Sequence, residues 1–441
     1  MDNATSLWRK DIVGWTLYDF ANTIYSMNIV SLYLKRYIVE DLGKDDRFFD
    51  IPFSISMVIA ALLLPALGAV SDHSSKKKIF LFLFTLTCCM AVGLMAAVPP
   101  QAVLVVVILF IIANFAYEAG QPFYNALLYS VAEGKRARFV SGIGVALGYV
   151  GSVAGMVVGL AFVTGNIFSF DVPLIEGGGK TGSFVPTAVL FFLFALPLFW
   201  WVREAPITKP GKVNLRKAYR EVWEGITATK KYPGVLRFLI ADYFFEDAAT
   251  TVIINIGLYC SIVIGFAETD ITRFLIVSTV SAVAGSFLIG KIAQKWSLKK
   301  LLRSIVIGWV VSLMAFVFLD YPVVTWILGS FVGILLGGLW TTSRPMLAEL
   351  VPREELGKFF GLFSLSGRAA AIIGPLIWTA VVYYFYADRY LGRTAIEWLN
   401  IQPSDYIKLP YKIAVLSLSL MMLFGLYIFR KVPDTHGSDN A

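Results

Sequence analysis

Seven ionisable residues lie well within long apolar stretches of this 441-residue chain, away from the ends of those stretches. They are Asp19, Glu118, Asp242, Glu246, Asp247, Arg344 and Arg368. If these stretches cross a membrane, a charge near the bilayer centre costs at least about 2.5–3.5 kcal/mol on insertion scales. Charged side chains at that depth usually face a partner or water inside the protein. These seven residues are therefore the first candidates for binding or moving a charged group.

Three of the acids share a predicted helix face with further polar residues. The three sets are Asp19, Asn22 and Ser26; Glu118, Gln121 and Asn125; and Asp247, Thr251 and Asn255. Their spacings of three or four residues place the members of each set on one face of an α-helix. We expect the three faces to line one polar cavity and to bind the substrate.

Proton transfer is a second task for the buried acids. A carboxylate removed from water takes up a proton more readily than it does in water. Glu118 lies about 16 residues into its apolar stretch, near the middle of a bilayer core. It is the leading candidate to carry a proton. Asp19, roughly 14 Å along its helix from Arg9 and Lys10, is the second candidate.

The two arginines have two possible roles. The planar guanidinium of an unpaired arginine binds a carboxylate or a phosphate through paired hydrogen bonds. Arg344, with the nearby Trp340, is the better candidate for binding substrate in this way. The alternative is an internal network with a gating role, made of Asp242, Glu246, Arg344 and Arg368.

The composition indicates an integral membrane protein. Hydrophobic residues make up 57% of the chain and charged residues 15%, with a mean hydropathy of +0.71. Soluble domains are about 45–50% apolar and about 25% charged. Twelve apolar segments approach or exceed the ~20 residues that cross a bilayer. In residue numbers they are 12–39, 51–71, 79–98, 102–131, 139–164, 184–202, 236–264, 271–293, 301–319, 323–350, 359–386 and 411–430.

The distribution of Lys and Arg predicts the orientation of these spans. Of the 38 basic residues, 26 fall in loops on one side, which the positive-inside rule assigns to the cytoplasm. Both termini should therefore be cytoplasmic. The net charge of +8 follows from this topology, so no nucleic-acid partner is expected. Cys88, Cys89 and Cys260 lack the spacing of a metal site or a disulfide framework, and no metal or cofactor is expected.

The two halves of the chain repeat each other. Three glycines recur 219 positions later, Gly142, Gly148 and Gly155 as Gly361, Gly367 and Gly374. Asp19 and Asp242 are 223 positions apart. These offsets predict an all-α fold in which twelve transmembrane helices form two six-helix bundles, a plan that places a transport site near the midplane.

The repeat and the charges predict the domain boundaries. Residues 1–202 form the first bundle, 203–235 a cytoplasmic linker, 236–432 the second bundle and 433–441 a cytoplasmic tail. The stretch VNLRKAYREVWEGITATKKY in the linker has an apolar helical face and a basic remainder. It is predicted to be an amphipathic helix at the membrane surface. A solvated linker is the alternative.

The loop GAVSDHSSKKK after the second span has the pattern G-x-x-x-D followed by basic residues. It resembles the signature loop of the major facilitator superfamily, which implies a gating role for Gly68, Asp72, Lys76 and Lys77. The stretches GWTLYDFANTIY, GQPFYNALLYSVA, GVALGYVGS and SRPMLAELVPREELGKFFGLFSLSGRAA are similar to the vacuole-effluxer-like family, whose members resemble autophagy-related amino-acid effluxers. The second copy of the loop departs from the pattern, with Gln294 where the superfamily has an acid.

These features predict a secondary active transporter that works by alternating access. The resemblance implies a small polar solute such as an amino acid or a similar zwitterion, and the buried acids imply coupling to protons. Export of organic cations or drugs by proton antiport is the alternative, because acids outnumber arginines five to two in the spans. A receptor or scaffold with the same fold is a further alternative. The protein should act as a monomer in the lipid bilayer, which is the plasma or inner membrane if the source is a prokaryote.

An enzyme is not expected. The two histidines lie outside the spans, His73 in a loop and His436 in the tail. An intramembrane Ser–His dyad, a haem site and a His-rich metal centre therefore all lack their ligands. The segment IEGGGKTGS resembles a phosphate-binding loop, but Leu174 stands where the motif requires glycine and no predicted strand precedes it. ATP is therefore not expected to drive transport on this chain.

Overall fold

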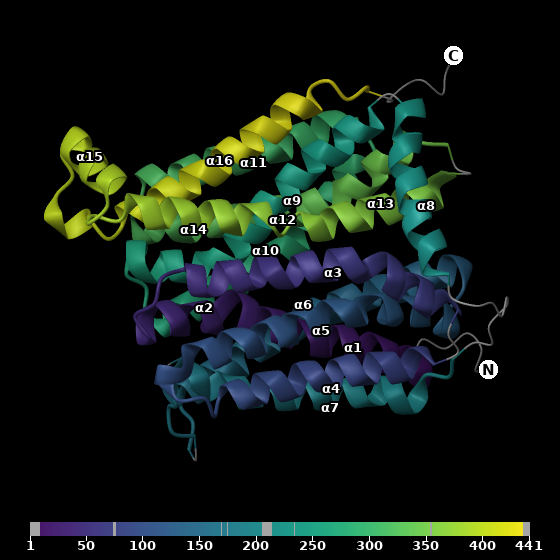
Figure 1. Cartoon of the computed structure of the whole chain (residues 1–441), viewed down its shortest axis with the longest axis horizontal. Helices are drawn as coiled ribbons and strands as arrows, with labels where there is room; N and C mark the ends of the chain where they lie inside the picture. The colour runs from purple at the N-terminus through teal and green to yellow at the C-terminus, as the bar shows by residue number, and fades with distance from the viewer. Residues whose placement is uncertain are drawn as a thin grey trace. The chain divides into compact units, whose positions relative to one another are not determined.

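The computed structural model of the chain describes residues 9–73, 76–168, 170–173, 175–204, 214–232, 234–352 and 355–434. Nearly all the regular structure in these ranges is helical (Figure 1). The chain divides into two compact units, of which the first comprises residues 1–44 and 55–219 and the second residues 45–54 and 220–441. The domain boundaries given by the sequence stay a prediction.

The first unit begins with a helical segment that alternates between α-helical and π-helical hydrogen bonding. It runs through α1 (Lys10–Tyr25), the π-helical η1 (Ser26–Tyr33), α2 (Leu34–Arg36) and the π-helical η2 (Tyr37–Asp41). The longer helices that follow are α3 (Arg47–His73), α4 (Lys77–Met95), α5 (Val103–Val131), α6 (Gly134–Thr164) and α7 (Phe184–Trp201). Shorter elements are η3 (Pro100–Ala102), the two-stranded ribbon of β1 (Asn166–Ile167) and β2 (Phe170–Asp171), and η4 (Lys180–Ser183).

The helix α8 (Leu215–Ala228) covers the linker segment that was predicted to be amphipathic. The elements that follow it are η5 (Thr229–Lys231), α9 (Val235–Tyr259), η6 (Cys260–Ile264), α10 (Glu268–Ala293), α11 (Leu298–Phe318), α12 (Pro322–Glu349), α13 (Leu356–Ala369), α14 (Ile373–Phe385), α15 (Tyr390–Leu399), η8 (Pro403–Asp405) and α16 (Leu409–Phe429). The eleventh predicted span is therefore divided into α13 and α14. The sequence analysis did not predict α15 or the ribbon.

Eleven helices in the described residues are long and apolar enough to cross a membrane. The first predicted span corresponds to the segment from α1 to η2, where the π-helical turns divide the helix into shorter pieces. The nearly all-helical, multi-pass fold class is thus confirmed. The count of twelve spans and the cytoplasmic location of both termini stay predictions.

Four helix contacts recur in the two units. In the first unit α1 packs against α6 and α7, and α4 packs against α5 and α7. In the second unit α9 packs against α14 and α16, and α11 packs against α12 and α16. Counted along each unit, the first span contacts the fifth and sixth, and the third contacts the fourth and sixth. This shared pattern supports the duplication that the glycine spacing predicts.

The first span of each unit also ends in the same way. The π-helical turns η2 and η6 cover residues 37–41 and 260–264, which are 223 positions apart at both ends. This is the offset that separates Asp19 from Asp242. A π-helical turn inserts a residue into the helix and is frequent near functional sites. The duplication therefore extends to local backbone geometry.

Glycine lets the first span of the first unit approach its fifth span closely. A Cβ atom added to Gly151 of α6 would lie 2.7 Å from the backbone carbonyl carbon of Phe20 in α1, and nearer still to its oxygen. Real Cβ atoms essentially never come within 3.0 Å of another heavy atom. The backbones of α1 and α6 are therefore in direct contact beside Asp19.

Candidate functional site

In the first unit, Asp19 lies half-buried on α1 where α1 faces α6. The Nδ2 atom of Asn22 donates a hydrogen bond to its carboxylate over 3.5 Å, and the hydroxyl of Tyr124 of α5 lies nearby. The carboxylate also lies against Gly144, where a side chain on α6 would displace it. Asn22 and the glycine thus restrict the position of the Asp19 carboxylate.

Glu118 lies half-buried on α5 and shares its surroundings with Asp19. Both carboxylates act electrostatically on the hydroxyl of the half-buried Tyr117, which also has Ser26 as a hydrogen-bond partner. The polar faces predicted for the first and fourth spans therefore meet around Tyr117. We name Asp19, Asn22, Tyr117, Glu118 and Tyr124 the acid cluster.

Aromatic rings support one side of the acid cluster. Trp15 and Tyr124 stack with their ring centroids 4.6 Å apart. Each also donates a hydrogen bond to the other's backbone carbonyl, from the Trp15 indole over 3.1 Å and from the Tyr124 hydroxyl over 3.2 Å. Sequence reasoning missed this pairing, because the two residues are 109 positions apart. The stack fixes the position of the Tyr124 hydroxyl beside Asp19.

The other predicted residues of this unit lie in different surroundings. Ser26 is half-buried and donates a hydrogen bond to the carbonyl oxygen of Thr23 over 3.1 Å. Gln121 is half-buried, whereas Asn125 is exposed. The stripe predicted on α5 thus changes from a half-buried surrounding to an exposed one within two turns.

In the second unit, the acids of α9 contact α12 through neutral partners. The Ser343 hydroxyl donates a hydrogen bond to the buried Asp242 over 2.6 Å. The Trp340 indole donates one to Glu246 over 2.9 Å. Arg344 lies within electrostatic range of Glu246, is exposed, and forms no ion pair within the described part of the chain. We name Asp242, Glu246, Trp340, Ser343 and Arg344 the arginine cluster.

The third predicted stripe is buried inside the packing of the second unit. Asp247, Thr251 and Asn255 each have 0% exposure. Both carboxylate oxygens of Asp247 accept the backbone N–H of Gly374 over 2.9 Å. Gly374 lies in the first turn of α14, so Asp247 satisfies a backbone donor at the break between α13 and α14. This geometry favours a structural role for Asp247.

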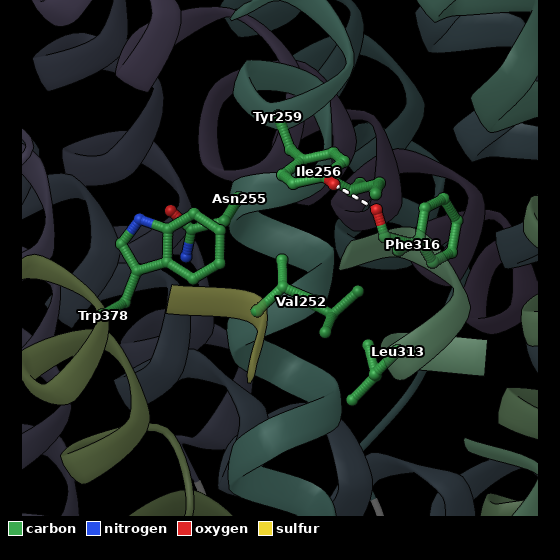
Figure 2. A pocket seen from close by; sticks show the side chains of 8 residues that line it. Val252, Asn255, Ile256, Tyr259, Leu313, Phe316 and Trp378 are labelled. Carbon is green, nitrogen blue, oxygen red and sulfur yellow. Dashed lines mark hydrogen bonds between the residues drawn. The ribbon is translucent and has the colours of Figure 1, made fainter. Parts of the chain in front are cut away.

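A small pocket lies in the second unit among α9, α11, α14 and α16. Figure 2 shows Trp378 and Asn255 on one side of it and Phe316 on the other, with the Tyr259 hydroxyl donating a hydrogen bond to the Phe316 carbonyl. Its remaining lining residues are apolar, namely Val252, Ile256, Leu313 and Val415. Of the predicted site residues, Asn255 lines this pocket.

The predicted gating residues are divided between the two units. Gly68 lies on α3 and Lys76 is exposed just before α4. The side chain of Asp72 lies outside the described part of the structure. The N-terminus of α4 is capped instead by Glu204, whose carboxylate accepts the backbone N–H groups of Lys77 and Lys78 over 2.8 and 3.1 Å. Arg368 is half-buried in the last turn of α13.

Two groups of charged residues escaped the sequence analysis. Asp46, which is 1% exposed, accepts hydrogen bonds from the Trp378 indole over 3.2 Å and from the Tyr411 hydroxyl over 3.0 Å. Lys180, in the segment that resembles a phosphate loop, forms ion pairs with Glu40 over 3.0 Å and Asp41 over 2.5 Å. All three acids lie in a predicted loop, where a charge is ordinarily solvated, so the sequence carries little signal for these contacts.

A multi-pass helical protein whose two units repeat these helix contacts has the architecture of a major facilitator transporter. Two solved structures share this fold over almost the whole chain. A bacterial homologue of the human lysosomal transporter Spinster matches with a TM-score of 0.73 and 14% identity, covering 96% of both chains. The nucleoside transporter NupG matches with a TM-score of 0.69 and 15% identity, covering 95% of this chain and 99% of its own.

Sequence comparison identifies the family. The model of the family described as vacuole effluxer Atg22 like matches residues 37–134 and 129–390, and the chain belongs to this family. An uncharacterized MFS-type transporter of Bacillus subtilis, YxiO, is 26% identical over 97% of this chain and 95% of its own. Autophagy-related protein 22 of Vanderwaltozyma polyspora is 20% identical over 87% of both chains. The family predicted from the sequence motifs is confirmed, and the chain is a multi-pass membrane protein of the major facilitator type.

Proposed function

We propose that this protein is a proton-coupled secondary transporter of a small zwitterion, with amino acids as the substrate class. Membership of a family described as vacuole effluxers supports transport of a solute. The observation that carries the proposal is the acid cluster, in which Asp19 and Glu118 share the surroundings of Tyr117 inside a membrane-embedded unit. Two carboxylates in such a place suit an ammonium group and a proton.

Asp19 is the proposed acceptor for the ammonium group. Its carboxylate accepts a hydrogen bond from Asn22 and is confined by Gly144. An acceptor that is already oriented loses little conformational entropy when it binds a cation.

Arg344 is the proposed partner for the carboxylate of the substrate. Asp242 and Glu246 have the hydroxyl of Ser343 and the indole of Trp340 as donors, so neither acid depends on the guanidinium for a hydrogen bond. This supports the substrate-binding role of Arg344 over the internal network that also includes Arg368. A guanidinium binds a carboxylate through two parallel hydrogen bonds.

Glu118 is the proposed proton carrier. It is one of the two acids of the acid cluster, and both acids act electrostatically on Tyr117. Protonation of Glu118 would change the charge felt by Tyr117 and by a cation bound at Asp19. Movement of the proton and of the substrate would thereby be linked.

Purified protein in proteoliposomes tests this proposal. A panel of radiolabelled L-amino acids should show counterflow in the wild type, and a pH gradient should drive uptake. We expect Glu118→Gln to abolish proton-driven uptake and to retain counterflow, and Asp19→Asn or Arg344→Gln to lose both. Asp270→Asn, at the start of α10, is the matched control and should behave as the wild type.

The alternative substrate class is an organic cation, which the excess of acids over arginines favours. Tetraphenylphosphonium is a suitable probe, because it carries no carboxylate. If it exchanges for protons and the amino acids give no counterflow, the amino-acid proposal is wrong and the antiport alternative holds. If no probe gives counterflow, a receptor or scaffold role replaces transport.

A further inference from the structure

The short helix α15 carries an apolar face that nothing in the described structure covers. Tyr390 is 81% exposed and Trp398 is 84% exposed. Leu391 and Leu399 are also exposed and lie on the same side of the helix, because positions 390, 391, 394, 395, 398 and 399 follow helical spacing. In Figure 1, α15 projects past the ends of α14 and α16.

The remaining sides of α15 have different surroundings. Gly392 and Ile396 are buried against the protein. A Cβ atom on Gly392 would lie 2.6 Å from the Phe385 carbonyl oxygen at the end of α14, so α15 is in backbone contact with that helix. Arg393 and Glu397 are exposed and form a third, charged side. One face of the helix thus packs against the protein, a second is charged and exposed, and a third is apolar and exposed.

The position of α15 in the chain fixes its height relative to the membrane. The four residues 386–389 separate α14 from α15, and α14 and α16 both belong to membrane-crossing helices. Four residues reach at most roughly 14 Å, and the contact at Gly392 keeps α15 beside the last residue of α14. The apolar face therefore lies at the level where a membrane span ends.

We propose that α15 lies in the membrane surface and inserts Tyr390, Leu391, Trp398 and Leu399 into the boundary between lipid headgroups and acyl chains. Tryptophan and tyrosine are enriched at this depth, because one end of each ring system is apolar and the other is polar. Tyr384, exposed in the last turn of α14, extends the same aromatic belt. The helix anchors the end of α14 to the bilayer.

The proposed insertion of α15 does not depend on the charge of the lipid headgroups. Within α15 the charges of Arg393 and Glu397 oppose each other, and no cluster of basic residues is present on the helix. Anionic lipid attracts polybasic segments in proportion to their charge. The insertion should therefore be the same in phosphatidylcholine as in phosphatidylcholine mixed with phosphatidylglycerol.

An environment-sensitive fluorophore tests the depth of the apolar face in nanodiscs. Trp398→Cys carries the label on this face and Arg393→Cys carries it on the charged face, as the matched control. Cys88, Cys89 and Cys260 are buried, and the labelled parent protein measures their background. We expect label at 398 to be quenched by a nitroxide on the upper acyl chain and protected from an aqueous quencher, and label at 393 to show the reverse.

Native tryptophan provides a second measurement that needs no label. Brominated lipid should quench the fluorescence of the wild type more than that of Trp398→Phe. The proposal would be overturned if the aqueous quencher reached the label at 398 as readily as the label at 393. It would also be overturned if brominated lipid quenched the tryptophan fluorescence of Trp398→Phe as much as that of the wild type. Cross-linking of two copies through 398, with no quenching by lipid, would also overturn it and would assign the face to a protein contact.

Discussion

Substitution of Gly151 tests the helix contact that positions Asp19. In Gly151→Ala the new methyl group would start 2.7 Å from the Phe20 carbonyl carbon, whereas ordinary contacts begin at 3.4 Å, so α1 and α6 must separate by at least the 0.7 Å difference. Overpacking of this kind costs typically about 1–3 kcal/mol, and replacing glycine by alanine in a helix recovers about 1 kcal/mol. Because the obstacle is backbone, we expect a net loss of about 2 kcal/mol in the free energy of unfolding.

Gly142 supplies the control within the same helix. A Cβ atom there meets nothing within 4 Å, so Gly142→Ala should be neutral or stabilising by up to about 1 kcal/mol. Equilibrium unfolding in mixed detergent micelles, followed by circular dichroism, measures both variants. Counterflow in proteoliposomes then reports whether the acid cluster survives.

The two variants should therefore differ in stability by about 2–3 kcal/mol, with the loss at Gly151. Transport should fall in Gly151→Ala and persist in Gly142→Ala, because separation of α1 from α6 moves Asp19 away from Gly144. Equal stability of the two variants would refute the close approach of α1 and α6, and with it the confinement of Asp19.

Three further predictions concern polar contacts. Asp247→Ala leaves the Gly374 N–H without its carboxylate and should lower the free energy of unfolding by about 1–3 kcal/mol. Asp247→Asn keeps an acceptor and should lower that free energy by less. Equal losses of stability in a micelle unfolding assay would contradict the capping role. Glu204→Ala should cost about 0.5–2 kcal/mol, as loss of an N-terminal cap does, and Glu204→Gln should recover part of it. Partial burial opposes ionisation of Asp320, but the hydrogen bond and charge of Lys412 at 3.1 Å, with the charge of Lys408, lower the pKa of this loop carboxyl below its ordinary value. Its ionised form therefore stabilises the fold at neutral pH by up to about 1 kcal/mol, and this contribution is lost as the pH falls through the lowered pKa. The stability difference between wild type and Asp320→Asn should accordingly shrink on acidification, and a constant difference would exclude the ion pair as its source.

The break between α13 and α14 had a signal that sequence analysis overlooked. Gly374 is followed by Pro375, and proline in the first turn of a helix is typical of a helix start, because its missing N–H needs no partner there. The continuous apolar run over 359–386 concealed this signal. Hydropathy averages over a window and cannot detect a change of hydrogen-bond pattern within it.

The sequence by itself determined the membrane class, the family, the duplication and the helices that carry the buried acids. Each of these depends on the local sequence, namely the hydrophobicity summed over a segment and the spacing of residues on a helix. Tertiary structure decided the partners of those acids. Ser343 for Asp242 and Gly374 for Asp247 are each more than a hundred positions away. A hydrogen bond requires two atoms within about 3 Å, and only the packing of distant helices brings them to that distance.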